Sequence, residues 1–470
     1  MESAVQYIQM VQKVQVVQNV QCEFAARIST CYLNKHLTPL NLLNVLTPIK
    51  LIEIINPLEP FEKTSNNKHF NKRSDVNLPT GNIFYICHSL LIPANMKNQI
   101  TAKPHYLILD ALRGVAAIVV VLFHIMETHG NPALDPRPDK FHQLINHGYL
   151  AVDFFFLLSG FVIGYAYDDR WGKMTLSGFF KRRLIRLQPM VVMGMLIGAL
   201  LFYFQDSTVA MPIIHTIPVW KMILIFFIGI TMIPIPVSMD IRGWQEMHPL
   251  DGPAWSLFFE YVANILYATI VRRFSNALLA VLVALSAAFL IYYTVTGPTG
   301  DLIGGWSLDP VQFKIGWIRL MYPFFAGLLL SRLIKIRSFN NAFLWCSLLL
   351  IATLFFPRLG NENELWKNGI YEAVVVILVF PAIVYIGASG QVTGRMEKVF
   401  QFLGDISYPL YITHYPIIYI YTAWVFDKKK HIDDAYPFSI LVLVSSLSIA
   451  WLCLKFYDEP VRRWLRKKFN

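Results

Sequence analysis

The apolar stretch from Leu107 to Met126 constrains the fold of this chain more than any other segment. Its length of roughly 20 residues is what an α-helix needs to cross a bilayer. It nevertheless contains Asp110, Arg113 and His124, although ionisable side chains in hydrocarbon are costly and rare. Arg113 and His124 are about three helical turns apart and share one face. We predict that this face borders a protein interior or a wet cavity. The alternative is that Arg113 reaches the lipid headgroups and His124 caps the other end.

The composition is that of a membrane protein with several spans. Hydrophobic residues make up 55% of the chain and charged residues only 15%, against about 25% charged in soluble proteins. The net charge of +11 lies largely in loops beside apolar segments, which indicates cytoplasmic loops rather than a nucleic-acid interface. The five cysteines form no CxxC pair and no metal-ligand spacing. We therefore expect neither a metal site nor nucleic-acid binding.

Residues 1–95 differ from the rest of the chain. They are rich in Asn, their apolar runs are too short to span a bilayer, and they show no signal-peptide pattern. Met96 precedes a short polar lead into the first apolar segment, as at a natural protein start. We expect residues 1–95 to be an N-terminal extension, either an upstream translation or a poorly ordered segment. Residues 96–470 are expected to form one membrane domain.

About ten further apolar segments follow the first one, and the basic loops orient them. Loop 169–187 and the pair Arg272 and Arg273 are both expected in the cytoplasm, so an even number of crossings must separate them. Three apolar segments lie between these loops, and we expect 219–237, which breaks at Pro234, not to span. The sequence predicts an all-α bundle of about ten transmembrane helices with both termini in the cytoplasm.

Three titratable residues are expected in the outer half of this bundle, on three different helices. They are His124, Asp153 and Glu260. A histidine beside a carboxylate suits general-base chemistry, because neutral imidazole accepts a proton near pH 7 and the carboxylate stabilises the imidazolium. A structural alternative stands beside each carboxylate. Asp153 is placed to satisfy backbone N–H groups at a helix start, and Glu260 to form an ion pair with a neighbouring helix.

Two further sets of polar residues are candidates for a site. Arg183 and Arg186 share a helix face on the inner side, where they either mark a cytoplasmic loop or bind a phosphorylated ligand. Ser407, Tyr411 and His414 share a face of the segment 402–426. We expect them to line a cavity, although a buried histidine is more often a packing residue.

Six motifs, in order and covering about residues 100–465, together resemble the acyltransferase-3 family of integral membrane acyltransferases. They are LDALRG…VVLFH, VDFFFLLSGFVI, FFKRRLIRLQP, GPAWSLFFE, LGDISYPLYITHYP and YDEP. The resemblance implies that an acyl-CoA, commonly acetyl-CoA, binds from the cytoplasm. It implies that the acyl group passes to a hydroxyl of a carbohydrate or lipid-linked glycan across a bacterial-type inner membrane.

The resemblance also assigns roles to individual residues. His124 matches the presumed catalytic histidine and Arg113 its partner in the Arg-x10-His motif. Arg183 and Arg186 match an Arg-x-x-Arg motif that contacts the donor, and Glu260 matches the acidic residue that closes the WSLxxE segment. The partners implied are therefore acyl-CoA, a glycan acceptor and membrane lipid.

The mechanism expected from these residues leaves two routes open. His124, assisted by Glu260 or Asp153, activates the acceptor hydroxyl directly, or it carries the acyl group as an acyl-histidine. A different class, a transporter or flippase of a glycan-linked or anionic substrate, also fits helices with polar interior faces. No inverted repeat is visible in the sequence, and consumption of acyl-CoA separates the two classes.

Overall fold

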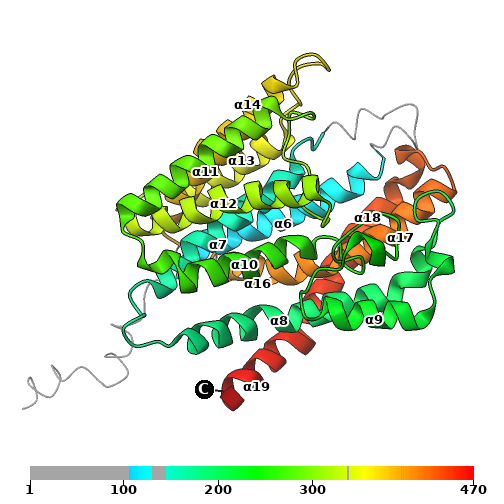
Figure 1. Cartoon of the computed structure of the whole chain (residues 1–470), viewed down its shortest axis with the longest axis horizontal. Helices are drawn as coiled ribbons and strands as arrows, with labels where there is room; N and C mark the ends of the chain where they lie inside the picture. Colours follow the sequence, from blue (N-terminus) through cyan, green and yellow to red (C-terminus); the bar gives the residue numbers. More distant parts are fainter. Residues whose placement is uncertain (1–104, 130–143, 336–337, 393, 395, 470) are drawn as a thin grey trace, which may run out of the picture. The chain divides into compact units, whose positions relative to one another are not determined.

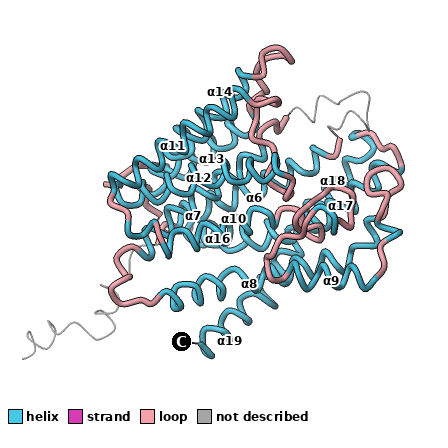
Figure 2. Tube along the Cα trace, in the orientation of Figure 1, coloured by secondary structure: helices cyan, strands magenta, loops and turns pink. Residues whose placement is uncertain are grey.

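The computed structural model describes residues 105–470, except 130–143, 336–337, 393, 395 and 470. These residues form helices joined by loops, without a β-sheet (Figures 1 and 2). The all-α prediction is therefore confirmed for the described part of the chain. The predicted extension, residues 1–95, lies outside the described residues.

The described helices follow one another as α6 to α19. The first seven are α6 (Leu107–Glu127), α7 (Ala151–Tyr167), α8 (Leu176–Leu201), α9 (Val219–Gly229), α10 (Ala254–Thr269), α11 (Asn276–Thr296) and α12 (Pro310–Leu333). The others are α13 (Ala342–Phe355), α14 (Trp366–Val374), α15 (Phe380–Ser389), α16 (Met396–Thr413), α17 (Tyr415–Asp427), α18 (Ile432–Cys453) and α19 (Glu459–Phe469). Single π-helical turns join α14 to α15 and α18 to α19.

Within the described residues, seven helical segments are long and apolar enough to cross a membrane. They are Leu107–Glu127, Gly148–Tyr167, Leu176–Gln205, Asn276–Thr296, Pro310–Leu333, Trp366–Ser389 and Ile432–Phe469. This is the helix content of an integral membrane protein, with fewer full-length spans than the about ten that apolar segment length predicts. The difference arises where an apolar segment is broken. The segment 402–426, for example, is divided at His414 between α16 and α17.

The segment 219–237 was singled out as one that does not span. It holds α9, which ends at Gly229 after 11 residues. Such a helix is about 16 Å long, whereas the hydrocarbon core of a bilayer is about 30 Å thick. The short helix agrees with the prediction made from the basic loops. The proline-rich connection that follows has no helix longer than one turn before α10 begins at Ala254.

Close helix contacts set the positions of the candidate residues on α6 and α7. A Cβ atom at Gly114 of α6 would lie 2.3 Å from the carbonyl oxygen of Leu403 on α16. A Cβ atom at Gly160 of α7 would lie 1.9 Å from the carbonyl oxygen of Phe324 on α12. Only glycine permits backbones to approach this closely, as is common between helices in membranes. These contacts hold α6 against α16 and α7 against α12.

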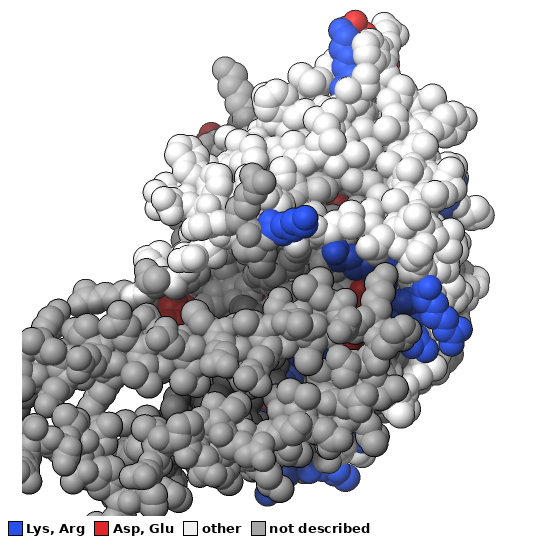
Figure 3. Space-filling model, turned by 90° about the vertical axis from the view of Figure 1, so that its left-hand side faces the viewer, with Lys and Arg blue, Asp and Glu red and all other residues white. Residues whose placement is uncertain are grey.

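The loops predicted to be cytoplasmic meet at one end of the bundle. Arg332 at the end of α12 forms an ion pair with Asp168 at the end of α7, with 2.6 Å between Nε and Oδ2. Arg272 after α10 lies over the ring of Trp171, 4.1 Å from its centroid. Among the residues drawn in colour in Figure 3, which faces the left-hand side of Figure 1, blue Lys and Arg side chains are more prominent than red Asp and Glu. The basic ends of α7, α10 and α12 are therefore neighbours, as the positive-inside rule requires of loops on one membrane face.

Candidate active site

Two cavities lie between the helices and meet at shared residues. The smaller, about 90 Å³, is named the arginine pocket after the three arginines that line it. The larger, about 540 Å³, is named the histidine cavity after His124. Val152 of α7 and Tyr411 of α16 line both cavities. Because Arg113 lines the first and His124 the second, α6 runs along both. The polar face predicted for α6 thus borders cavities.

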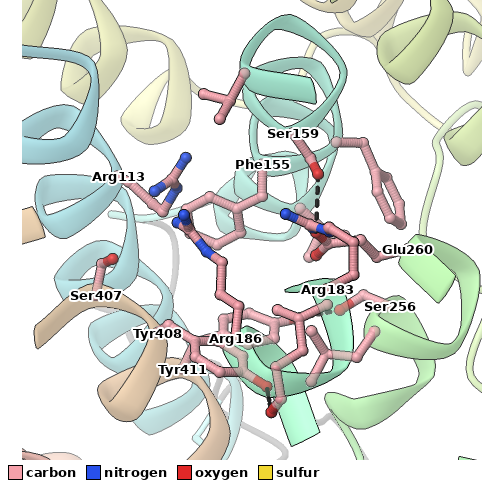
Figure 4. Close-up of a pocket in the computed structure, with 15 residues that line it drawn as sticks. Arg113, Phe155, Ser159, Arg183, Arg186, Ser256, Glu260, Ser407, Tyr408 and Tyr411 are labelled. Carbon is pink, nitrogen blue, oxygen red and sulfur yellow. Dashed lines mark hydrogen bonds and ion pairs between the residues drawn. The ribbon is translucent and has the colours of Figure 1, made fainter. Parts of the chain in front are cut away.

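The arginine pocket gathers charged side chains from three helices (Figure 4). Arg183 of α8 forms an ion pair with Glu260 of α10, with 2.6 Å between Nη2 and Oε1. The Ser159 hydroxyl of α7 donates a hydrogen bond of 2.8 Å to the same carboxylate oxygen. Arg113 of α6 pairs with Asp110 one turn earlier, at 2.9 Å. These contacts hold two of the three guanidinium groups in place.

Arg186 is the third arginine of the pocket and differs from the other two. It is exposed at the pocket's edge, and among the described residues no hydrogen bond or ion pair to it is found. The pocket lining contains three arginines and a single carboxylate, that of Glu260. An excess of positive charge with one free guanidinium fork is an arrangement that binds phosphate oxygens. The arginine pocket is therefore suited to an anionic ligand.

His124 lies in the last turn of α6 and is oriented by a carboxylate. Its Nδ1 is 2.9 Å from Oε2 of Glu127, which lies three residues later on the same helix. An ionised carboxylate only accepts hydrogen bonds, so Nδ1 carries the proton and Nε2 keeps its lone pair. The ring of Tyr415 packs edge-on against the imidazole, with 4.7 Å between centroids. The arrangement leaves Nε2 as a base beside the histidine cavity.

Asp153 is engaged by an arginine that the sequence analysis did not single out. Arg319 of α12 contacts both carboxylate oxygens, with 2.7 Å between Nη2 and Oδ2. It also donates to the carbonyl oxygens of Tyr149 and Gly304, at 2.6 and 2.9 Å. Both side chains of the ion pair are buried. Arg319 thus ties α7, α12 and the loop before α12 together.

The structure does not bring Asp153 or Glu260 to His124, which corrects the expected grouping of the three residues. Within the described residues no hydrogen bond or ion pair joins either carboxylate to the imidazole. Glu260 lines the arginine pocket with Arg113, not the histidine cavity. Glu260 forms an ion pair with a neighbouring helix, which is its structural alternative. Asp153 forms an ion pair with Arg319, which neither of its two readings described. Helical periodicity places a side chain on a face but does not determine which neighbouring helix it meets, and Glu127 supplies the carboxylate instead.

Of the three residues in segment 402–426 that were expected to line a cavity, two do so and the third, His414, does not. Ser407 and Tyr411 line the arginine pocket, and Tyr411 reaches the histidine cavity as well. The Tyr411 hydroxyl is 2.8 Å from the Ser256 hydroxyl. His414 is buried and lines neither cavity. Its Nδ1 donates to the carbonyl oxygens of Leu410 and Tyr411 at 3.0 and 2.9 Å. Its ring stacks on that of His124, with 5.5 Å between centroids. Tyr411 therefore lies, with Val152, where the two cavities meet.

A second glutamate, Glu246, lines the histidine cavity from the connection between α9 and α10. The Tyr419 hydroxyl lies 2.7 and 2.6 Å from its two carboxylate oxygens. Arg242, which is fully buried, lies 3.5 Å from the same carboxylate. Burial raises the pKa of Glu246 to about 7, although the Arg242 charge and the Tyr419 hydrogen bond oppose the shift. The carboxyl group is held in place and faces the same cavity as His124.

Comparison with known proteins shows the family. A family model described as an acyltransferase domain, acyltransferase-3, matches residues 106–455. The chain belongs to the acyltransferase-3 family. The matched range contains every residue that lines the arginine pocket and the histidine cavity. The family predicted from the six motifs is therefore confirmed.

Curated relatives of this acyltransferase-3 chain are bacterial. It is 32% identical over 192 residues to protein 2 in the picA locus of Rhizobium radiobacter, covering 40% of this chain and 93% of the relative. It is 24% identical over 386 residues to a putative O-acetyltransferase of Staphylococcus aureus strain COL, and 24% identical over 384 residues to O-acetyltransferase OatA of strain NCTC 8325. Each match covers 77% of this chain and 58% of the staphylococcal protein, so the chain spans little more than half the length of these relatives. No solved structure shows a significant match to it.

Three residues of the site escaped the sequence analysis. Arg319 could have been found in the same way as Arg113, because it too is an ionisable residue inside an apolar segment. Glu127 lies three residues after His124, a spacing that brings side chains together on a helix. Glu246 offers no such signal, because it lies in a loop whose path only the tertiary structure defines. Among the described residues, no group of three or more His, Cys, Asp and Glu is placed to hold a metal ion.

Proposed function

We propose that the protein transfers an acyl group, most simply acetyl, from cytoplasmic acyl-CoA to a hydroxyl of a carbohydrate or lipid-linked glycan on the other side of the membrane. One observation carries this proposal. A cationic pocket and a cavity with an oriented histidine meet at Tyr411 and Val152, along one helix of an acyltransferase-3 domain. The staphylococcal relatives named as O-acetyltransferases support acetyl as the group and oxygen as the acceptor atom.

The arginine pocket is the proposed binding site for the phosphates of coenzyme A. Arg186 offers a free guanidinium fork, and Arg183 adds a second that Glu260 holds in position. From Arg113 to His124 the axis of α6 rises by about 16 Å. An extended pantetheine arm would follow this helix past Tyr411 and bring the thioester to His124. The donor then enters at one end of the bundle, while the acceptor enters the histidine cavity.

The chemistry follows from the orientation of His124. Nε2 accepts the proton of the acceptor hydroxyl as its oxygen forms a bond to the thioester carbonyl carbon. The tetrahedral oxyanion then collapses, the C–S bond breaks, and the imidazolium returns the proton to the coenzyme A thiolate. Arg113 and the hydroxyls of Tyr411 and Ser256 are the candidate donors to the oxyanion. In the second route that stays open, Nε2 itself attacks the carbonyl carbon and the C–S bond breaks, which releases the coenzyme A thiolate and leaves an acyl-imidazolium. The acceptor oxygen then attacks the acyl carbon, the bond to Nε2 breaks, and the hydroxyl proton passes to the thiolate.

The proposed setting is a bacterial-type cytoplasmic membrane, with both chain termini in the cytoplasm. The basic ends of α7, α10 and α12 would then lie inside, and the mouth of the histidine cavity outside. About ten membrane-embedded helices would require several of the shorter described helices, such as α13, to pack within the bilayer beside the seven full-length candidates. Membrane lipid would cover their exposed apolar faces.

The test of this function is acceptor-dependent release of coenzyme A by the purified full-length protein in nanodiscs. Acetyl-CoA labelled in the acetyl group serves as donor, and a glycan fraction of a bacterial envelope serves as acceptor. We expect thiol release to rise with the glycan, and label to enter it as an alkali-labile ester. Intact acetyl-CoA together with glycan movement across sealed vesicles would instead establish the transporter or flippase.

Arg186→Ala is expected to weaken donor binding. Loss of a charge-assisted hydrogen bond to phosphate costs about 1.5–3 kcal/mol, which corresponds to a roughly 10- to 150-fold rise in the KM for acetyl-CoA. Arg186→Lys keeps the charge but not the fork and should be intermediate. Arg182→Ala is the matched control, since this exposed arginine of the same helix lines neither cavity. Equal effects of Arg186→Ala and Arg182→Ala on KM would show that only the net charge at this end of α8 matters.

A further inference from the structure

The outer wall of the histidine cavity is built by two loops that each contribute a tryptophan. Trp244 lies in the connection between α9 and α10, and Trp306 lies in the loop between α11 and α12. The backbone N–H of Met247 donates a 2.8 Å hydrogen bond to the carbonyl oxygen of Trp306, which joins the two loops. Both tryptophans are only partly buried. They therefore have ring surface available to a ligand in the cavity.

The third tryptophan of the cavity, Trp255, has no comparable free surface. It is buried, and the guanidinium of Arg319 lies over its ring, 5.0 Å from the centroid. Among the three tryptophans of the lining, free ring surface is therefore found on the two that lie in loops. Trp244 and Trp306 can therefore contact a ligand, whereas Trp255 is a packing residue of the cavity wall.

The loop that carries Trp244 is held in one conformation. The Asp240 carboxylate accepts hydrogen bonds from the backbone N–H groups of Arg242, Gly243 and Gln245, each at 2.9 Å. Gln245 has a φ of 57°, a left-handed conformation that is uncommon for a residue other than glycine. The indole Nε1 of Trp244 donates to the carbonyl oxygen of Ala210 at 2.8 Å. A ring fixed in advance loses little entropy when a ligand binds to it.

A hydrogen-bond acceptor lies beside this aromatic surface. Glu246, two residues after Trp244, presents a carboxylate to the cavity. A carboxylate has about four acceptor positions, and the Tyr419 hydroxyl has a single proton to offer it. The carboxylate can therefore accept further hydrogen bonds from a ligand hydroxyl. Glu127, which orients His124, lines the same cavity.

We propose that Trp244, Trp306 and Glu246 form the acceptor subsite, in which a pyranose ring lies against the indoles while Glu246 accepts a hydrogen bond from one of its hydroxyls. The inference rests on the proposed function and adds to it the residues that select the acceptor. The electron-rich face of an aromatic ring attracts the electropositive C–H groups of a sugar face. A cavity of about 540 Å³ is within the usual range for small-molecule sites. A lipid chain in the same place would leave the remaining acceptor positions of the Glu246 carboxylate unfilled.

The test compares apparent KM values for the envelope glycan in the nanodisc assay described above. Trp244→Ala and Trp306→Ala are each expected to raise this KM about tenfold, the effect of losing an aromatic contact and its buried area. Trp306→Phe keeps an aromatic face and should recover most of the loss. Trp345→Ala is the control, since this tryptophan is 57% exposed on α13 and lines neither cavity. The KM for acetyl-CoA, which reports on the arginine pocket, should stay unchanged in these variants.

Methyl pyranosides of glucose, galactose, mannose and N-acetylglucosamine are the competitor probes. We expect at least one to compete with the glycan in the wild-type protein, and sorbitol, which has hydroxyls but no ring, not to compete. Competition by octanol alone, or unchanged glycan KM values in both alanine variants, would overturn the subsite. Failure of the wild-type protein to release coenzyme A with the glycan fraction would instead refute the proposed function.

Discussion

Replacing His124 by alanine is expected to lower kcat/KM for glycan-dependent acetyl transfer by about 10²–10⁴-fold, the usual contribution of a general base. The reason is the hydrogen bond from Nδ1 to Glu127, which leaves Nε2 as an acceptor beside the cavity. The measurement is coenzyme A release by the purified variant in nanodiscs. Size-exclusion and thermal unfolding profiles of the variant establish that it is folded. A variant with wild-type kcat/KM would exclude His124 from the reaction.

Two further variants show whether the effect of His124→Ala is specific. His215→Ala removes an imidazole whose side chain is 59% exposed outside both cavities, and its activity should match wild type. Glu127→Gln keeps a hydrogen-bond acceptor for Nδ1 but removes the charge that stabilises the imidazolium. We expect its kcat to fall less than that of His124→Ala, with an unchanged KM for acetyl-CoA. A kcat equal to wild type would remove Glu127 from the mechanism.

Replacing Arg319 by methionine is expected to destabilise the protein by about 3–5 kcal/mol, because it leaves the Asp153 carboxylate buried without its partner. The Asp153 side chain is fully buried, and the Arg319 side chain is only 2% exposed. The same arginine holds two backbone carbonyls, of Tyr149 and Gly304, whose hydrogen bonds would also be lost. Thermal unfolding in detergent measures the effect. Lys367→Met is the control, since its ion pair with Glu364 is substantially exposed and worth about 1 kcal/mol or less.

The double variant Asp153→Leu with Arg319→Met distinguishes a structural from a catalytic Asp153. Replacing both members of a buried ion pair by apolar residues of similar size is often neutral. We therefore expect the double variant to regain most of the stability that Arg319→Met loses, and measurable transfer activity with it. A double variant that unfolds like wild type yet releases no coenzyme A would return Asp153 to the list of reacting groups.

Much of the membrane architecture is contained in local sequence. Apolar segment length predicts the seven long apolar helical segments of the described residues, because a helix in lipid must satisfy its own backbone hydrogen bonds. It also predicts spans, such as 402–426, that the structure divides. The basic loops predict that α9 is not a span, and the helix in that segment is indeed short. The eleven-residue interval between Arg113 and His124 places both on one face, and both line cavities. The six motifs are local as well, and they identify the family.

The pairing of charges is where sequence reasoning about the site reached its limit. Glu260 and Asp153 were expected beside His124 because each lies in the outer half of a predicted span. A shared depth in the membrane, however, does not bring two side chains together. Their contact also depends on how each helix is rotated about its axis and on which helices are its neighbours. Glu260 meets Arg183, which is 77 residues away in the chain, and Asp153 meets Arg319, 166 residues away. Contacts at such separations depend on how the helices pack.

The sequence by itself therefore determined the long apolar helices of this acyltransferase-3 chain, the polar face of α6 and the family. These properties depend on hydrophobicity, helical period and short motifs, all of which act between residues close in the chain. Only the tertiary structure decided that the site consists of an arginine pocket and a histidine cavity that meet at Tyr411 and Val152, and that loops supply Trp244, Trp306 and Glu246 to the second. The physical reason is that a cavity is the space left where separate elements pack, and no single element contains it.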